Sequence, residues 1–320
     1  MTNLPVPADA TVLALDLAVL ADHAAALAEN ARAANTRRAY RSDWRHFSAW
    51  ADAQGLNGLP AAPPVIGMYL AAHETTLSVA TLTRRLSSIA VAHRMAGHSF
   101  DSRHPAIADV MRGIRRARGS APRAAEALTV ARLRQVLEEF GDRLADHRDR
   151  ALLLVGTAAA LRRSELVALN VADIAVTPEG LRITIRRSKT DQEGEGAVLA
   201  VGRTRRATCP AAAYERWLVE AGIREGAAFR AVDRHGRLGG RLSGNAIALI
   251  VQRRAAAAGL DPGMYSGHSM RAGFATSAAR AGIGEIAIAR QTRHASLNVL
   301  RRYVREGRLF DEALTQEIGL

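Results

Sequence analysis

Cysteine, aromatic residues and lysine are scarce in this sequence, and each scarcity excludes something. Cysteine occurs once, as Cys209, which excludes an internal disulfide and any metal site built from several cysteines. Aromatic residues make up 4% of a chain that is 48% hydrophobic. Since alanine dominates that hydrophobic fraction, the balance favours packed helices over a large sheet. Lysine also occurs once, as Lys189.

Long hydrophobic runs are missing as well. No apolar stretch approaches the ~20 residues that a membrane-spanning helix needs, and the N-terminus has no basic region followed by an apolar one. We therefore expect a cytoplasmic protein without a membrane partner.

What the chain has in excess is positive charge. Its 44 lysine and arginine residues outnumber its 31 aspartate and glutamate residues, which makes the formal net charge +13. This excess predicts a polyanionic partner such as nucleic acid. A compositional bias in the gene would explain a protein rich in arginine, but it leaves the single lysine unexplained.

The length of 320 residues allows two domains, each with its own core. Residues 119–127 have the composition of a linker. We therefore predict an N-terminal domain over 1–118 and a second domain over 128–320.

The N-terminal domain is predicted to be helical after a loose arm at its start. Its clearest helix is expected over 35–54, where four aromatic residues recur at i, i+4, i+7 and i+10: Tyr40, Trp44, Phe47 and Trp50. Spacing this regular is typical of a face that packs into a core, and an aromatic nucleic-acid surface is the alternative. Further helices are expected over 17–34, 65–73, 75–96 and 109–118.

Arginines of this domain are candidates for contact with a nucleic-acid backbone. They lie opposite the aromatic stripe, on the expected exposed side of the helix over 75–96, and at the end of the helix over 109–118. They are Arg37, Arg38, Arg41, Arg45, Arg84, Arg85, Arg112, Arg115 and Arg116. A solvated charged face is the alternative.

The second domain is also predicted to be mainly helical. Residues 181–185 and 197–201 alternate like strands, and the hairpin between them carries Lys189. The fold class is therefore mainly α: two helical domains, the second with a small antiparallel sheet. Its helices are expected over 129–140, 146–160, from Arg162–Arg163 onward, and over 208–221, 243–258, 268–281, 284–291, 297–305 and 307–317.

The last fifth of the chain carries polar side chains at short, fixed intervals. His268 and Arg271 are three apart and share a face on a helix. Ser266 is the expected cap, which would put His268 in the first turn, where an anion is favoured. His294 and Tyr303 are nine apart and would point in opposite directions on one continuous helix.

A break at Ala295–Ser296, with Ser296 capping a new helix, would let the His294 and Tyr303 side chains converge. Two imidazoles, a guanidinium and a phenol around one anion describe a site for attack on a phosphodiester.

These motifs resemble the tyrosine recombinase (phage integrase) family. The run Ala-Leu-Arg-Arg-Ser-Glu-Leu at 160–166 is similar to the first signature of the family, usually Gly-Leu-Arg-x-Ser-Glu-Leu. The resemblance covers about 128–320, and it continues in family order through Lys189, His268-x-x-Arg271, His294 and Tyr303. The first domain resembles the core-binding domain of the family only in size and helicity.

The resemblance implies a site-specific DNA recombinase of the simple two-domain, Cre-like type. It assigns catalytic roles to Arg162, Lys189, His268, Arg271, His294 and Tyr303, with Glu165 beside Arg162. Tyr303 would attack phosphorus and hold the strand as a 3′-phosphotyrosine. The two arginines would bind the non-bridging oxygens, because their planar forks stay charged at any working pH.

The remaining roles also follow from the resemblance. His268 would take the phenol proton or position a phosphate oxygen, and His294 would donate a hydrogen bond to a non-bridging oxygen. Lys189 would protonate the departing 5′ oxygen. Two residues depart from the family pattern: Ala160 and Arg293 each replace a common glycine, and Arg293 would tolerate a positive φ poorly.

The resemblance further implies double-stranded DNA with a specific recombination site as partner, no cofactor, no metal and no ATP. It implies a tetramer on paired sites, nucleoid-associated when bound to DNA. An apolar stripe after Tyr303 would dock onto a neighbouring subunit: Leu309, Phe310, Leu314 and Ile318. Packing of that stripe on its own domain is the alternative. The short N-terminal arm argues against an additional arm-site-binding domain.

Three other functions remain open. A type IB topoisomerase would use similar chemistry without partner sites, and a catalytically silent relative would keep the basic surface. A metal-dependent nuclease is disfavoured because no carboxylates cluster near the histidine motifs. Tyr265, three residues before His268, is the nearest rival to Tyr303 as nucleophile.

Overall fold

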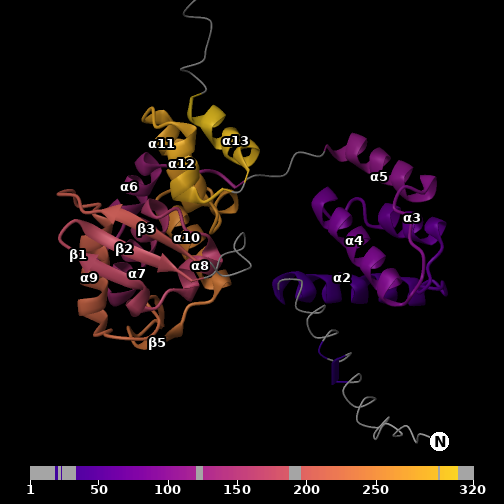
Figure 1. Cartoon of the computed structure of the whole chain (residues 1–320), viewed down its shortest axis with the longest axis horizontal. Helices are drawn as coiled ribbons and strands as arrows, with labels where there is room; N and C mark the ends of the chain where they lie inside the picture. Colours follow the sequence, from indigo (N-terminus) through magenta and orange to yellow (C-terminus); the bar gives the residue numbers. More distant parts are fainter. Residues whose placement is uncertain are drawn as a thin grey trace, which may run out of the picture. The chain divides into compact units, whose positions relative to one another are not determined.

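The computed structural model of the protein describes residues 19–20, 23, 34–119, 125–186, 196–294 and 296–308 (Figure 1). Contacts between residues divide the chain into two compact units, Met1–Arg123 and Ala124–Leu320, each of which is described by itself. Among the described helices, none combines the length and the apolar character that crossing a membrane requires.

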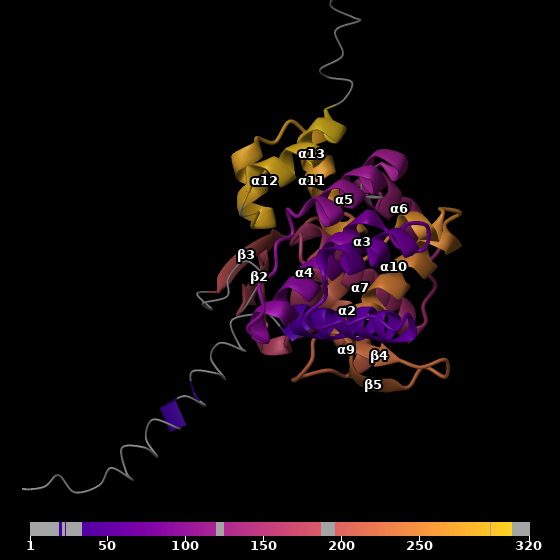
Figure 2. The same cartoon turned by 90° about the vertical axis from the view of Figure 1, so that its right-hand side faces the viewer.

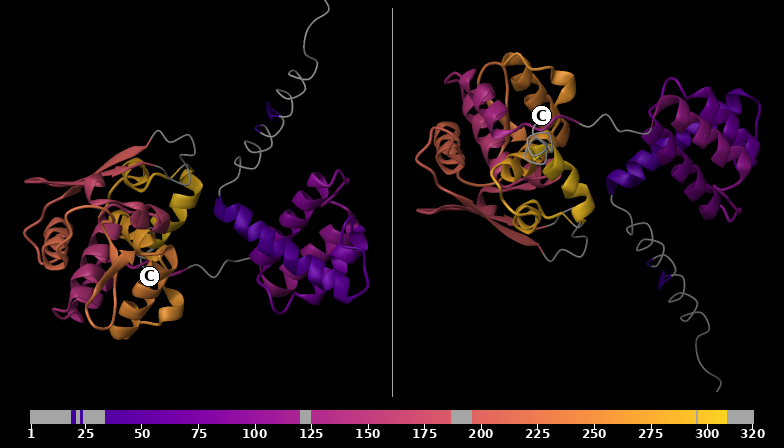
Figure 3. Two further views of the ribbon diagram at one scale, coloured as in Figure 1. Left: turned by 90° about the horizontal axis from the view of Figure 1, so that it is seen from below. Right: turned by 90° about the horizontal axis from the view of Figure 1, so that it is seen from above.

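The first unit is a bundle of helices (indigo to purple in Figure 3). It contains α2 (Ala34–Ala53), α3 (Pro63–Ala72), α4 (Val79–Met95) and α5 (Pro105–Arg118). Helix α2 packs on α4, and α3 packs on α5. Phe47 is fully buried, with Trp44 and Trp50 packed partly buried against the same core. The aromatic stripe therefore faces the core, as its spacing predicts.

Two helices of this unit start elsewhere than expected, and local capping explains both starts. Helix α4 begins at Val79 because the hydroxyl of Ser78 accepts a hydrogen bond from the Thr81 amide at 3.1 Å. Helix α5 begins at Pro105, a residue that suits a first helical position because it has no N–H to leave unpaired.

The second unit is mainly helical with two small sheets. Its helices are α6 (Val130–Glu138), α7 (Leu144–Ala158), α8 (Arg163–Ala168), α9 (Pro210–Ala221), α10 (Gly244–Ala257), α11 (Ser269–Arg280), α12 (Glu285–Thr292) and α13 (Leu297–Gly307), with short 3₁₀ turns at Val171–Asp173 and Pro262–Met264. Its strands are β1 (Ile174–Thr177), β2 (Gly180–Ile185), β3 (Ala197–Gly202), β4 (Arg230–Val232) and β5 (Leu238–Arg241).

Strands β1, β2 and β3 form one antiparallel sheet in that order, and β4 pairs with β5 in a second. The register of β2 and β3 places Leu181 opposite Val201 and Ile183 opposite Leu199, all four buried. This pair was predicted from its alternation. The strands β1, β4 and β5 were not, because they are short and their exposed and buried residues do not alternate.

The core of the second unit is organised around α7, which is buried on all sides from Ala151 to Thr157. Helices α9 and α11 pack on it. Helices α11, α12 and α13 form one group (gold and yellow in Figures 1 and 2). These helices pack around a second core cluster of mainly small buried residues, which includes Ala275, Ala279, Leu300 and Val304.

The second unit begins earlier than the expected linker end. Ala127 and Leu128 are buried, and the Leu128 amide donates to the Ser269 carbonyl at 2.9 Å. A Cβ on Gly273 would collide with the Leu128 carbonyl, so this glycine permits the close approach of α11. Residues 126–128, part of which we expected in the linker, therefore pack on the second unit. Of the helix expected over 307–317 only residues 307–308 are described, and Gly307 is there the last residue of α13. The apolar stripe from Leu309 onward lies outside the described residues.

Candidate functional site

Four of the predicted site residues lie at the ends of helices in the second unit. Arg162 is the N-cap residue of α8, and His268 is the N-cap residue of α11. Arg271 follows in the first turn of α11. His294 lies in the turn between α12 and α13, and Tyr303 projects from α13. The predicted break between the two helices is present, since Ser296 is the N-cap residue of α13, but the Ser296 side chain makes no capping hydrogen bond with the described residues.

The His268 imidazole contacts the Tyr303 phenol. His268 Nε2 lies 2.7 Å from the Tyr303 hydroxyl, and the tyrosine is only 4% exposed. Burial lowers the pKa of His268, and the nearby charges of Arg271, Arg302 and Arg162 lower it further. The imidazole is therefore neutral near pH 7 and can accept a proton.

The Tyr303 hydroxyl has a second polar neighbour, Arg302, whose Nη2 donates to it at 3.2 Å. In the His268 tautomer that carries its hydrogen on Nδ1, Nε2 accepts the phenol hydrogen. His268 itself lies one residue before α11, not in its first turn as we expected. The Ser266 hydroxyl accepts from the His268 amide at 3.2 Å and so caps the turn ahead of the helix.

Arg271 is the most buried cation of the site. It is 2% exposed, and its Nη1 donates to the Ala160 carbonyl at 2.9 Å. Its Nη2 is buried and has no hydrogen-bond partner within the described part of the chain. Burial, reinforced by the charges of Arg162 and Arg293, lowers the pKa of Arg271 to about 9. Arg271 therefore remains charged at neutral pH and has a donor to offer to an anion.

Arg162 and Glu165 form a tight pair. Arg162 donates from Nη1 to Glu165 Oε1 at 2.7 Å, and its amide donates to Oε2 at 2.8 Å. The Glu165 side chain is fully buried. Burial alone would raise the pKa of Glu165, but the charge of Arg293 and the hydrogen bonds from Arg162 outweigh it and hold the pKa below its usual value. This carboxylate holds the Arg162 side chain in place.

His294 is held by its neighbour Thr292. The Thr292 hydroxyl lies 2.7 Å from His294 Nδ1 and 2.7 Å from the Ile288 carbonyl. The hydroxyl donates its single hydrogen to the Ile288 carbonyl, so it accepts from His294 Nδ1–H, and the neutral ring carries its hydrogen on Nδ1. Burial first, and then the charges of Arg271 and Arg162, lower the pKa of His294 to about 4. The ring centroids of His294 and Tyr303 are 6.4 Å apart.

Tyr265, the rival to Tyr303, is committed to other partners. Arg132 Nη1 donates to its hydroxyl at 2.7 Å, and the hydroxyl lies 3.3 Å from a Glu126 carboxylate oxygen. Burial raises the pKa of Tyr265. The tyrosine that lies beside His268 is therefore Tyr303.

Sequence reasoning missed the contacts of Arg293 and Arg302. Arg302 donates to the Tyr303 hydroxyl, and its guanidinium lies 5.2 Å from the centre of that ring. Arg293 forms an ion pair with Glu165 at 2.6 Å. The available signals were the pair Arg301–Arg302 directly before Tyr303 and the arginine in place of a glycine at 293. Lys189 lies outside the described residues.

The predicted DNA-facing arginines of the first unit divide into two groups. Arg41, Arg45, Arg112, Arg115 and Arg116 are exposed, as is Arg38, and Arg37 is partly buried. Arg84 forms a two-pronged pair with buried Asp43, at 2.7 and 3.0 Å.

The expectation that Arg85 is exposed is wrong. It is 9% exposed and donates to the Tyr69 hydroxyl at 2.6 Å, with Asp43 at 3.6 Å. The helical period turns Arg85 toward the interior of the bundle, where the Tyr69 hydroxyl accepts its hydrogen bond and the buried Asp43 carboxylate lies nearby.

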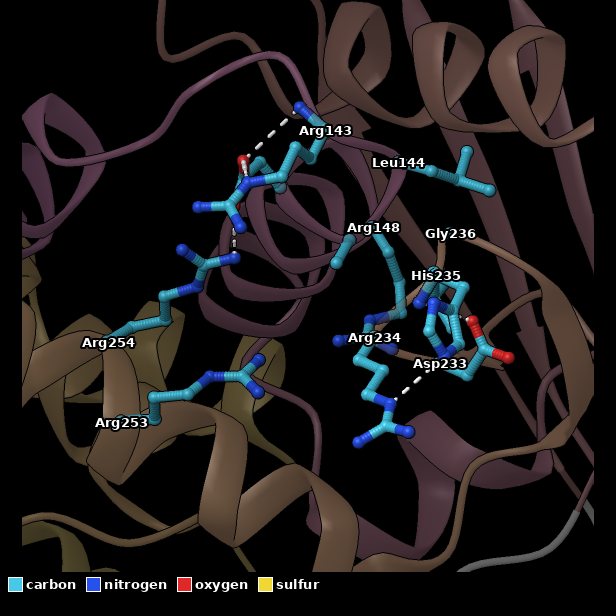
Figure 4. Close-up of a pocket in the computed structure, with 12 residues that line it drawn as sticks. Arg143, Leu144, Arg148, Asp233, Arg234, His235, Gly236, Arg253 and Arg254 are labelled. Carbon is cyan, nitrogen blue, oxygen red and sulfur yellow. Dashed lines mark hydrogen bonds and ion pairs between the residues drawn. The ribbon is translucent and has the colours of Figure 1, made fainter.

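A cavity of about 600 Å³ lies elsewhere in the second unit (Figure 4). Arg143, Arg253 and Arg254 lie on one side of it, with Arg234 and His235 on the other. Arg254 is paired with Asp146 at 2.5 Å and with Asp149 at 2.7 Å. None of the site residues above lines this cavity.

Comparisons with known proteins agree on one family. A model of the phage integrase family matches residues 126–308, and a model of the phage integrase N-terminal SAM-like domain matches residues 23–98. An integrase/recombinase xerD homolog from Selenomonas ruminantium is 37% identical over 297 residues, which cover 90% of this chain and 86% of that protein.

Two further proteins are similar. The recombinase cre of Escherichia phage P1 is 29% identical over 285 residues, covering 82% of this chain and 81% of its own. The crystal structure of the XerH site-specific recombinase bound to palindromic difH substrate, a post-cleavage complex, superposes with a TM-score of 0.59. Its identity is 19%, with 80% of this chain and 72% of that chain covered, so it shows a shared fold.

Proposed function

The chain belongs to the phage integrase family, the tyrosine recombinases, and we propose that it cuts and rejoins DNA at a specific site with Tyr303 as nucleophile. It is a site-specific recombinase, and neither curated relative described above favours a type IB topoisomerase or a silent DNA-binding protein.

One observation carries the proposal. A neutral His268 lies 2.7 Å from the Tyr303 hydroxyl, beside an arginine whose buried Nη2 has no partner in the described part of the chain. Such an orphaned donor is costly unless a ligand satisfies it. A non-bridging phosphate oxygen would do so, and it would bring phosphorus within reach of the phenol.

In the proposed reaction His268 Nε2 takes the phenol proton as Tyr303 attacks phosphorus. The bond from Tyr303 to phosphorus forms, and the bond from phosphorus to the 5′ oxygen breaks. Because the product is a phosphodiester of tyrosine, the strand can be rejoined without an external energy source. Attack by a 5′ hydroxyl on the phosphotyrosine reverses the steps.

Charge develops on the non-bridging oxygens in the transition state, and cations placed in advance stabilise it. Arg271 Nη2 and the Arg162 guanidinium would bind these oxygens. Because Thr292 accepts the Nδ1 hydrogen, His294 would donate to the same group from Nε2 in its protonated form, which a bound phosphate favours. Lys189 is our candidate for protonating the departing 5′ oxygen, on the strength of the family motif alone.

We propose double-stranded DNA with a specific recombination site as partner, and a nucleoid-associated protein when bound. The similar proteins described above, which are recombinases and include a complex with difH substrate, support DNA as substrate. A tetramer on paired sites, held by the segment after Tyr303, is also part of the proposal. So is a DNA-contacting role for the N-terminal domain over 1–118.

The test is to recover the DNA that becomes attached to the protein. Wild-type protein is incubated with DNA from its host, denatured with detergent, and the adducts are isolated and sequenced. One recurrent sequence, joined through a 3′ phosphate, is the expected result. Tyr303→Phe should yield no adduct yet bind the recovered site, and Tyr265→Phe should still yield it.

Adducts that persist in Tyr303→Phe would show that another residue is the nucleophile. Loss of cleavage in EDTA, restored by magnesium, would instead favour a metal-dependent nuclease.

A further inference from the structure

Arg293 has an unusual backbone conformation. Its φ is 54° and its ψ is 48°, in the left-handed region at the C-cap of α12. Among the described non-glycine residues only Ala160 shares a positive φ, at 47°. Side chains beyond glycine adopt this region at a cost, and they persist there when surrounding contacts hold them. Both residues border the site, and contacts of the Arg293 side chain hold it in this conformation.

The Arg293 side chain is anchored at three points. Its Nη2 donates to Glu165 Oε2 at 2.6 Å, and its Nη1 contacts the carbonyls of Gln291 at 3.1 Å and Ala159 at 3.4 Å. The side chain is only 12% exposed. Glu165 is fully buried, so this ion pair is shielded from water and from salt.

The Arg293 backbone contacts Arg162 directly. Arg162 Nη2 donates to the Arg293 carbonyl at 3.0 Å, while Arg162 Nη1 donates to Glu165 Oε1 at 2.7 Å. Arg162, Glu165 and Arg293 therefore form a closed ring of contacts. Glycine would reach this backbone conformation more easily, but it has no side chain to bind Glu165.

We propose that Arg293 is a positioning residue that orients the guanidinium of Arg162 toward the scissile phosphate, through its carbonyl and through Glu165. Its left-handed turn directs the carbonyl at Arg162 and the side chain at Glu165 simultaneously. The same turn leads directly into His294, whose amide donates to the Ala289 carbonyl at 3.3 Å. The inference rests on the proposed role of Arg162.

The experiment compares Arg293→Gln and Arg293→Gly with wild type on the recovered recombination site. Single-turnover cleavage should fall about 10- to 100-fold, the range seen when an outer-shell partner is removed, with DNA affinity nearly unchanged. Arg290→Gln is the matched control, because Arg290 is exposed and lies one turn earlier in α12; it should cleave at the wild-type rate.

A purely structural role is separated by a double-mutant cycle with Arg162→Ala. If Arg293 acts through Arg162, the double variant should cleave no more slowly than Arg162→Ala alone. If the double variant cleaves more slowly than Arg162→Ala by the factor that the Arg293 substitution costs alone, the inference is overturned. If Arg293→Gln fails to fold, Glu165→Gln/Arg293→Gln removes both charges and leaves no unpaired carboxylate. It should fold and show the same slow cleavage.

The outcomes distinguish this inference from the proposed function. Slow cleavage by Arg162→Ala with wild-type cleavage by both Arg293 variants would overturn only the role of Arg293. Full activity of Arg162→Ala would overturn the role of Arg162 and the positioning role with it.

Discussion

His268 Nε2 and the Tyr303 hydroxyl are 2.7 Å apart, although 35 positions separate the two residues in the chain. The packing of α11 against α13 brings them together. A Cβ on Gly307 would lie 2.9 Å from Ala279 Cβ and 2.8 Å from the Thr276 carbonyl, so a glycine is required where the end of α13 crosses α11. The distance between base and nucleophile therefore depends on small residues outside the site.

The pH dependence of cleavage should report His268. Since burial and nearby arginines lower its pKa below 6.5, the base stays neutral at pH 7, and the rate should decline only as pH falls below about 6.5. His268→Gln should be slower by about 10²- to 10⁴-fold and lose this decline. Single-turnover cleavage from pH 5 to 8 measures both. A variant that keeps the wild-type profile would show that another group titrates.

Arg271→Lys should retain charge and lose function. A lysine offers one point charge, whereas Arg271 holds the Ala160 carbonyl with Nη1 and leaves Nη2 for an oxygen. We expect cleavage to fall by about 10²- to 10³-fold, as for loss of one oxyanion donor. Arg280→Lys, at the exposed end of the same helix, is the control for the substitution. Equal rates for the two variants would contradict the role of Arg271.

Stability should fall in acid because of His294. Its pKa is about 4 when folded and about 6.5 when unfolded, so between these values the unfolded chain binds more protons. The free energy of unfolding is therefore not reduced by His294 above pH 6.5, and it falls as pH drops from 6.5 toward 4, because the folded state resists the protonation that the unfolded chain undergoes. Allowing for the partial exposure of the ring, the loss should be on the order of 2 kcal/mol.

The measurement is chemical denaturation of wild type and His294→Gln at pH 7.5 and 4.5. Carboxylates titrate in both proteins, so the difference between them isolates His294. An equal loss of stability in the two would contradict the lowered pKa.

The arginines of the first unit should separate into two behaviours. Exposed Arg41→Ala should reduce the slope of log affinity against log salt by about 0.9, as for one lost phosphate contact, without changing thermal stability. Arg85→Ala should leave that slope unchanged and destabilise the unit by about 1–3 kcal/mol, because buried Asp43 and Tyr69 lose a partner. The reverse pattern would place Arg85 at the DNA.

Lys189→Arg should keep DNA affinity and lose most cleavage. Arginine supplies the charge, but its pKa above ~12 makes it a poor proton donor near neutrality. Replacing the 5′ bridging oxygen by sulfur, a leaving group that needs no proton, should restore cleavage in this variant. Full cleavage of ordinary DNA would contradict the general-acid role, and a slow variant that sulfur does not rescue would assign Lys189 to positioning.

The sequence predicted the helices best where periodicity and capping are local properties. The stripe through Phe47 faces the core, and the break before Ser296 separates α12 from α13. The sequence did not predict the burial of Arg85, because its partner Asp43 is distant in the chain. Nor did it predict β1, which pairs with the adjacent β2 but is short and shows no alternation of buried and exposed residues.

By itself the sequence determined which reactive side chains exist, their order and the helices that carry them. The reason is that residue type and helical periodicity are local properties of the sequence. Only the tertiary structure decided that Tyr303, and not Tyr265, faces His268, and that Arg293 binds Glu165 in a left-handed turn. These outcomes depend on distances between residues up to 133 positions apart. Such distances are set by how α7, α11 and α13 pack, and by the need of each buried charge for a partner.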